Sequence, residues 1–203
     1  MQLRETADPV PGSDQVLIKV RAAGVNFSDI LARRGRYPEA PNPPVVVGYE
    51  VSGIIEAVGE GVHGFRVGQS VIAPVFFGGY STKVCVPKEQ VFLLPSGMTF
   101  SEGAALAVNY LTAFGTAMKM ARLKKEDRVL IYSAGGGVGL ALFDLCRRVG
   151  AIPIGIASVS KHTRLQERGF QTILDSQSPT LDQDIFQLSQ KGGFDVIFDT
   201  RGG

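Results

Sequence analysis

The glycine-rich segment at residues 129–139 has residue types and spacing that could bind phosphate groups. Four apolar or aromatic residues precede the run Ser-Ala-Gly-Gly-Gly-Val-Gly, and apolar side chains then recur at helical spacing. In a dinucleotide-binding turn the first glycine position needs a small residue, the second lets a pyrophosphate approach, and the third lets the helix pack on the strand. Ala134, Gly136 and Gly139 take these three positions. The predicted cofactor-binding residues of the turn are Ala134, Gly136, Gly137, Val138 and Gly139. A glycine-rich turn without a ligand is the alternative.

The segment after the next predicted strand bears on which dinucleotide would bind. An NAD site usually places an acid about 20 residues beyond the glycine turn, where it binds the ribose 2′-hydroxyl. Residues 156–164 contain no acid, and the first one after them is Glu167. They do contain Ser158 and Lys161, whose hydroxyl and ammonium groups suit a 2′-phosphate. The sequence therefore favours NADPH over NADH; the alternative is that Lys161 and Arg164 belong to the solvated face of a helix.

The elements that must position these residues change in character near residue 100. Before it, short apolar runs alternate with turn residues, as expected of a sandwich or partly open barrel. The predicted strands there are Gln15–Arg21, Gly53–Val58, Ser70–Ala73 and Ser81–Val86. The proline-rich segment at 38–44 is predicted to be an irregular loop.

After residue 100, helices and strands alternate, which predicts a parallel sheet with helices on its faces. A capping box at Thr99–Glu102 is predicted to open a helical stretch that runs to about Met120. The strands expected to follow are Arg128–Tyr132, Ile152–Ile156, Thr172–Leu174 and Asp195–Asp199. The helices expected between them are Gly137–Val149, His162–Arg168 and Leu181–Gln190.

Composition excludes several functional classes. A net charge of +2 over 203 residues, with no run of Lys or Arg, does not suggest a nucleic-acid partner. No apolar run approaches the ~20 residues that a membrane-spanning helix needs, so no integral membrane segment is predicted. The only two cysteines, Cys85 and Cys146, lie far apart, and a thiol-reducing cytosol is the expected compartment.

Four segments in the first half, together with the glycine turn, resemble the medium-chain dehydrogenase/reductase superfamily. The four segments are Gly24–Asp29, Gly48–Gly53, Val58–Val62 and Gly78–Tyr80. The resemblance implies an α/β protein. A GroES-like β-barrel domain over residues 1–100 would bear the substrate and catalytic groups, and a partial Rossmann domain would follow over residues 101–203. Family chains are longer at both ends, so we expect a fragment or shortened isoform that lacks N-terminal strands and part of the cofactor site. The resemblance leaves open a homodimer of the full-length protein.

Metal chemistry separates the branches of this superfamily. Its zinc alcohol dehydrogenases carry a Cys and a His as catalytic ligands, where this chain has Asn26 and Tyr49. An amide and a phenol are not ordinary zinc ligands, so no metal is predicted. The chain thus resembles the zinc-independent quinone oxidoreductase branch, especially its vesicle amine transport protein-like members.

This resemblance implies hydride transfer from NADPH to a quinone or an α,β-unsaturated carbonyl in a cytoplasmic enzyme. It implies that Asn26 donates to the developing oxyanion, that Tyr37 and Tyr49 are pocket residues, and that Thr112 lies near the nicotinamide. A tyrosine that quinone reductases often carry is Leu31 here, which leaves the substrate open. Alternatively, Asn26 caps a turn and the two tyrosines only pack. Asn109 and Thr112 are predicted to open a helix, and their side chains alternatively bond to local backbone.

A second functional class also fits the sequence. The chain could keep the reductase fold as a non-catalytic or membrane-surface-associated binding protein, or as an inactive shortened isoform. The two classes differ in whether hydride from a bound cofactor reaches a substrate.

Overall fold

The computed structural model describes residues 1–200 and divides the chain into two compact units. The first unit is Met1–Val108 and the second is Asn109–Gly203. Each unit has a sheet and a hydrophobic core of its own, and each is described by itself.

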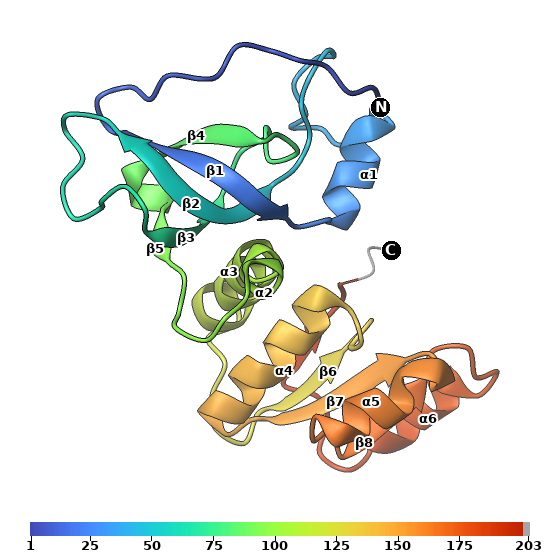
Figure 1. The fold of residues 1–203 in the computed structure, drawn as a ribbon. Coiled ribbons are helices and arrows are strands. Elements are labelled where there is room, and N and C mark those ends of the chain that lie inside the picture. Colours follow the sequence, from blue (N-terminus) through green and yellow to red (C-terminus); the bar gives the residue numbers. More distant parts are fainter. Residues whose placement is uncertain (201–203) are drawn as a thin grey trace. The chain divides into compact units, whose positions relative to one another are not determined.

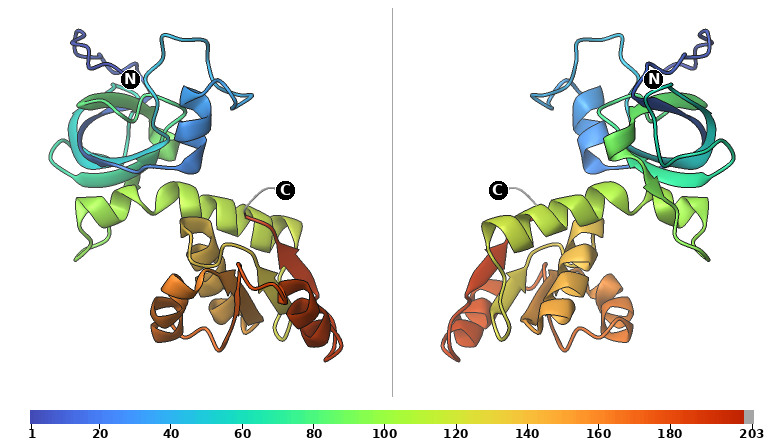
Figure 2. Two further views of the ribbon diagram at one scale, coloured as in Figure 1. Left: turned by 90° about the vertical axis from the view of Figure 1, so that its right-hand side faces the viewer. Right: turned by 90° about the vertical axis from the view of Figure 1, so that its left-hand side faces the viewer.

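The first unit is built on a five-stranded antiparallel sheet with the order β4-β1-β2-β3-β5 (Figure 1). The strands curl into a strongly bent sheet (Figure 2). The core that they enclose consists mostly of valine and isoleucine side chains. Its strands are β1 (Gln15–Ala23), β2 (Glu50–Val58), β3 (Ser70–Pro74), β4 (Lys83–Pro87) and β5 (Phe92–Leu93). Its helical segments are α1 (Phe27–Arg33), η1 (Lys88–Gln90) and α2 (Phe100–Ala104).

The pairing of β1 with β2 explains the curvature of this sheet. The register shifts at two places along the pair, between Leu17 and Ile18 and between Val20 and Ala22. Such irregularities increase the local twist and bend a sheet toward closure. Gly53 allows the close approach of the two strands, since a Cβ there would lie 2.2 Å from the Lys19 carbonyl oxygen. The predicted strands therefore form a curved antiparallel sheet.

The second unit is built on a parallel sheet with the order β8-β7-β6-β9 (Figure 1). Its strands are β6 (Arg128–Ile131), β7 (Ile152–Ala157), β8 (Thr172–Asp175) and β9 (Val196–Phe198). Its helices after β6 are α4 (Gly137–Val149), η3 (Val159–Lys161), α5 (His162–Glu167) and α6 (Leu181–Ser189). The predicted alternation of strands and helices is confirmed, within two residues at every boundary.

Alternate residues of β6 serve the two faces of this sheet. Val129 and Ile131 pack in one core cluster with side chains of α4 and α5. Leu130 packs in a second cluster with Ile154 and with side chains of α6. Because both faces are covered by helices, the strands are mainly apolar, as is typical of parallel sheets.

The helical stretch before β6 differs from the sequence expectation. The capping box is confirmed, since the Thr99 hydroxyl accepts the N–H of Glu102 at 3.2 Å. The stretch is not one helix, however. α2 ends at Ala104, α3 runs over Ala107–Phe114, and a π-helical turn, η2, covers Gly115–Met120. The Thr116 hydroxyl donates to the carbonyls of Thr112 and Ala113, and such hydroxyl bonds compete with the helical backbone pattern.

Candidate functional site

The turn after β6 forms as the glycine pattern requires. Ser133 adopts a left-handed conformation with φ of 50°, which turns the chain sharply at the end of the strand. The buried Ala134 donates its N–H to the Ile156 carbonyl at 3.0 Å. At Gly139 a Cβ would lie 2.6 Å from the Ser133 oxygen and 2.7 Å from the Ala134 Cα. The small residues at 134 and 139 therefore let α4 pack directly on the turn.

The other glycines of the turn make room for two side chains from elsewhere in the second unit. A Cβ at Gly135 would lie 2.6 Å from the Cδ of Lys161, so the lysine stem crosses the turn at this glycine. A Cβ at Gly137 would lie 2.3 Å from the Oδ1 of Asn109. Gly136 has only the Ser133 oxygen nearby, at 3.2 Å. The turn is thus open at Gly136 and covered on both sides.

The N-terminus of α4 is suited to an anion. The helix has 13 residues, begins after the extended Gly136, and has no acidic residue in its first turn. The first N–H groups of a helix have no partner within it, and the helix dipole adds a partial positive charge there. Gly137, Val138 and Gly139 supply these first N–H groups. They would hold the phosphates of a dinucleotide.

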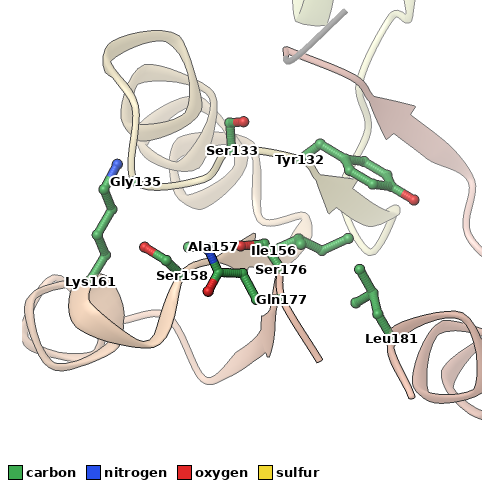
Figure 3. A pocket seen from close by; sticks show the side chains of 10 residues that line it. All are labelled: Tyr132, Ser133, Gly135, Ile156, Ala157, Ser158, Lys161, Ser176, Gln177 and Leu181. Carbon is green, nitrogen blue, oxygen red and sulfur yellow. The ribbon is translucent and has the colours of Figure 1, made fainter. Parts of the chain in front are cut away.

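A cavity of about 220 Å³ adjoins this turn. It lies at the carboxyl ends of three neighbouring parallel strands, the position where such sheets bind ligands. Figure 3 shows Lys161 reaching toward Gly135 at one end, and Tyr132 and Leu181 at the other. The lining residues are Tyr132, Ser133, Gly135, Ile156, Ala157, Ser158, Lys161, Ser176, Gln177 and Leu181.

Sequence reasoning found only two of the polar residues in this cavity, Ser158 and Lys161. It missed Ser133, Ser176 and Gln177. Ser176 and Gln177 directly follow β8. Because parallel strands end at a common edge, the residues after β8 could have been expected beside those after β7.

The end of β7 carries hydroxyl and cationic groups and no acid, as the sequence indicated. The Ser158 Oγ lies 3.2 Å from the Ser160 Oγ. His162 is engaged with the backbone, its Nε2 being 3.0 Å from the Ala157 carbonyl oxygen. Lys161 is exposed and lines the cavity, whereas Arg164 does not line it. Hydroxyl and ammonium groups of this kind can bind a phosphate group.

In the first unit, Asn26 is held at both its main chain and its side chain. It is the N-cap of α1, and its main-chain N–H donates to the Asp29 Oδ2 at 2.8 Å. Its side-chain Nδ2 donates to the Glu50 Oε1 at 2.9 Å. Asn26 therefore occupies the N-cap position, but its side chain bonds to Glu50 and makes no cap hydrogen bond. The bond to Glu50 does not use the second hydrogen of the Nδ2 group.

Two buried carboxylates organise this region, and sequence reasoning assigned neither a role. Asp29 also accepts the Gly48 N–H at 2.9 Å and the Tyr80 hydroxyl at 3.0 Å. Glu50 is 1% exposed and also accepts the Val108 N–H at 2.8 Å. Burial raises the pKa of Glu50, and the bonds from Val108 and Asn26 oppose that rise. Burial and the bond to Asp29 raise the pKa of Tyr80 to about 12.

Tyr37 and Tyr49 lie together in a small aromatic cluster with Phe77. The Tyr37 and Tyr49 rings meet edge to face at 5.7 Å, and the Tyr49 and Phe77 rings are 4.9 Å apart. Tyr49 is 8% exposed, and within residues 1–200 its hydroxyl has no hydrogen-bond partner. Burial, and the neighbouring Tyr37 and Asp29, raise the pKa of Tyr49 to about 12. At neutral pH it is a protonated donor.

The unpartnered hydroxyl leads to a prediction on stability. We expect Tyr49→Phe to raise the free energy of unfolding by up to about 1 kcal/mol, because a buried polar group without a partner is costly. Tyr80→Phe is the matched control, since its hydroxyl donates to Asp29. It should lower the free energy of unfolding by about 1–2 kcal/mol. Urea unfolding measures both, and a loss of stability in Tyr49→Phe would contradict the burial argument.

The helix that carries Asn109 and Thr112 begins earlier than expected. α3 starts at Ala107, so both residues lie inside it rather than at its opening. Thr112 is exposed, and its carbonyl accepts the Thr116 hydroxyl at 2.9 Å. The Asn109 side chain lies against Gly137 at the start of α4.

Two further observations concern metals and membranes. Residues 1–200 contain no group of three or more His, Cys, Asp or Glu side chains placed to hold a metal ion. Over the same residues, none of the helices has both the length and the apolar character needed to cross a membrane.

The chain combines a curved antiparallel sheet with a parallel sheet that carries a glycine turn, and known proteins share this combination. Residues 12–96 match the model of the alcohol dehydrogenase GroES-like domain. The fold resembles that of the medium-chain dehydrogenase/reductase superfamily, to which its structural neighbours belong. It is similar to the synaptic vesicle membrane protein VAT-1 homolog of Homo sapiens, with 40% identity over 204 residues. That match covers 100% of this chain and 52% of the human protein, so the chain spans about half the length of this curated relative.

Solved structures agree with this assignment. The CurK enoyl reductase superposes with a TM-score of 0.92 and 31% identity, over 98% of this chain and 63% of that one. A mycobacterial protein complexed with NADPH superposes with a TM-score of 0.89 and 29% identity, over 98% of this chain and 62% of that one.

Proposed function

We propose that this chain binds NADPH and belongs to a zinc-independent oxidoreductase that reduces a quinone or an α,β-unsaturated carbonyl. The observation that carries the proposal is the cavity beside the glycine turn, where Ser158 and Lys161 follow β7 and no acid takes their place. The residues from 101 onward would hold the cofactor, and residues 1–100 would bear the groups that act on the substrate.

The cofactor would supply a hydride from its nicotinamide ring. The second unit would bind it through N–H groups at the start of α4 and through Lys161 and Ser158. Thr112, exposed on α3, would contact the nicotinamide side. These residues bind and orient, which is the main requirement of a hydride transfer.

The first unit would supply hydrogen-bond donors. Reduction of a quinone or an enone places negative charge on the substrate oxygen, and preorganised donors stabilise such charge. Asn26 keeps one Nδ2 hydrogen beyond its bond to Glu50, and the Tyr49 hydroxyl is a buried donor without a partner in the described chain. Tyr37 packs edge to face on Tyr49 and would lie beside the substrate.

The comparisons support the nicotinamide-cofactor and reductase parts of this proposal. One structural neighbour is an enoyl reductase, which is why we propose an enone as one acceptor class for this chain. The mycobacterial neighbour binds NADPH. Both superpose over 98% of this chain.

A second candidate is a protein that binds the nucleotide without catalysis. The observation that favours it is the engagement of the first unit's donors. Asn26 already gives one hydrogen to Glu50, and the Tyr49 ring is packed between Tyr37 and Phe77.

One titration series tests both candidates. The purified chain is titrated with NADPH and with NADH while nicotinamide fluorescence is followed, and a simple quinone or enone is then added. We expect tighter binding of NADPH and oxidation that depends on the acceptor. Binding without oxidation would favour the second candidate, and a folded chain that binds neither nucleotide would refute the proposal.

A further inference from the structure

The side chain of Asn26 can be placed in two orientations that differ by exchange of its amide nitrogen and oxygen. Which one the protein adopts decides whether Asn26 offers a donor or an acceptor to a ligand, and the neighbours of an amide determine this choice. The side-chain neighbour of the Asn26 amide is Glu50, whose Oε1 lies 2.9 Å from the Nδ2.

When Glu50 is ionised, its carboxylate has acceptors and no donor. Each of its two oxygens then receives a hydrogen bond from a different donor. Oε1 receives the Asn26 Nδ2 and Oε2 receives the Val108 main-chain N–H at 2.8 Å. No lysine or arginine within residues 1–200 forms an ion pair with Glu50, although its side chain is almost completely buried. A buried carboxylate without a cation is stabilised by its hydrogen bonds, so both donors matter.

We propose that Glu50 is a positioning residue, whose two-acceptor carboxylate fixes the Asn26 amide with its nitrogen turned inward and its second N–H available as a donor. This inference rests on the proposed function of Asn26 as the donor to the substrate oxygen. Asp29 completes the arrangement, because it accepts the main-chain N–H of Asn26 at 2.8 Å and thereby fixes the start of α1. The two carboxylates hold the same residue at different atoms.

Glu50→Gln tests the requirement for two acceptors. A glutamine has nearly the same shape, but it offers one oxygen and one NH₂ group. With the Val108 N–H and the Asn26 amide both pointing at this side chain, one donor would face the introduced NH₂ group. The Val108 N–H belongs to the main chain and cannot turn away, so we expect it to keep the remaining oxygen. Either the bond to Asn26 then breaks or the Asn26 amide turns over. In both cases Asn26 loses its protected hydrogen.

The direct readout is the side-chain NH₂ signal of Asn26 in the ¹⁵N-asparagine-labelled full chain. The sequence has only three asparagines, Asn26, Asn42 and Asn109, so the signals are few. Asn26→Ser assigns the pair by its disappearance, and the exposed Asn42 serves as the solvent reference. We expect one Asn26 hydrogen to exchange about tenfold or more slowly than those of Asn42, because a bonded hydrogen exchanges only after local opening.

The variants then separate positioning from general stability. Glu50→Gln should bring the exchange of the Asn26 hydrogen close to that of Asn42. Glu50→Asp should restore part of the protection, because it keeps two acceptor oxygens. Tyr80→Phe is the matched control, since it removes a hydrogen bond from Asp29 and leaves the Asn26 amide untouched. Its Asn26 signal should remain protected.

The kinetic readout connects this arrangement to the reaction. For Glu50→Gln we expect kcat to fall on the order of 10- to 100-fold, the scale of a misplaced catalytic group. The Kd for NADPH should be unchanged, because the predicted nucleotide contacts lie in the second unit. If Glu50→Gln removes the protection of the Asn26 hydrogen but leaves kcat unchanged, the role of Glu50 in the reaction is overturned.

The outcomes keep this inference apart from the proposed function. If the wild-type chain binds NADPH but reduces nothing, the proposed function fails, while the Asn26 signal still decides whether Glu50 positions the amide. If the wild-type Asn26 pair exchanges as fast as Asn42, or if Glu50→Gln leaves it protected, the inference is overturned. Should Glu50→Gln fail to fold, the wild-type comparison and Glu50→Asp decide in its place.

Discussion

Gly139→Ala is expected to lower the free energy of unfolding of the second unit by about 3 kcal/mol, the upper end of the range for an inserted methyl group in a packed interior. The added Cβ would lie 2.6 Å from the Ser133 oxygen and 2.7 Å from the Ala134 Cα. Both are main-chain atoms that cannot rotate away. Ser133 is already in a left-handed conformation, so the turn has little freedom to adjust. NADPH binding should weaken together with stability, because the displaced atoms belong to the glycine turn that would hold the phosphates.

Urea unfolding followed by circular dichroism at 222 nm measures this effect, since α4, α5 and α6 all belong to the second unit. Gly115→Ala is the matched control. A Cβ at Gly115 meets no heavy atom within 4 Å, and the residue lies in a helical segment. It should leave stability unchanged or raise it by up to about 1 kcal/mol. Equal effects of the two substitutions would show that the strand and helix do not meet closely at Gly139.

The turn could be predicted because its requirements are local. The strand, the small residues and the helix lie within residues 128–149, and each has a recognisable pattern in the sequence. The order of strands and helices in the second unit was predictable for the same reason. The break between α2 and α3 was not, because the continuous apolar pattern conceals it. The π-helical turn after α3 was not predicted either. It contains Gly115 and Thr116, whose hydroxyl donates to the Thr112 carbonyl.

The contacts that complete the candidate sites could not be predicted, because they join residues distant in the chain. Asp29 receives the hydroxyl of Tyr80, and Glu50 receives the N–H of Val108. Both acids end or lie within segments that resemble the superfamily, but the local pattern does not indicate which donors each acid binds. Their burial depends on how the strands of the first unit close around them. Sequence reasoning therefore found Asn26 and missed what holds it.

Gly135 and Gly137 show the same limit within the glycine turn itself. The pattern explains a glycine by the ligand or by the turn, yet at these two positions the space of the missing side chain is taken by Lys161 and Asn109. The placement of Lys161 has a functional consequence. The Lys161 stem crosses the glycine turn at Gly135. Ser158 lies at the end of β7, where a ribose would be bound.

Lys161 would consequently be within reach of either the 2′-phosphate or the pyrophosphate of a bound nucleotide, and Lys161→Gln distinguishes the two. If its ammonium group binds the 2′-phosphate, the Kd for NADPH should rise about 10- to 100-fold, the scale of one hydrogen bond to a charged group, with little change for NADH. If it binds the pyrophosphate, both nucleotides should weaken by similar factors, because both contain that group. Fluorescence titration at two salt concentrations measures the two Kd values and their electrostatic part.

We expect the first result, because residues 156–164 contain no acid to bind a free 2′-hydroxyl, whereas the pyrophosphate would already have the N–H groups at the start of α4. Lys191→Gln is the matched control: it removes the same charge from the second unit at an exposed residue that does not line the cavity. It should change neither Kd beyond the small effect of net charge. A parallel loss of both nucleotides in Lys161→Gln would assign the lysine to the pyrophosphate, and the preference for NADPH would then have to rest on Ser158 and Ser160.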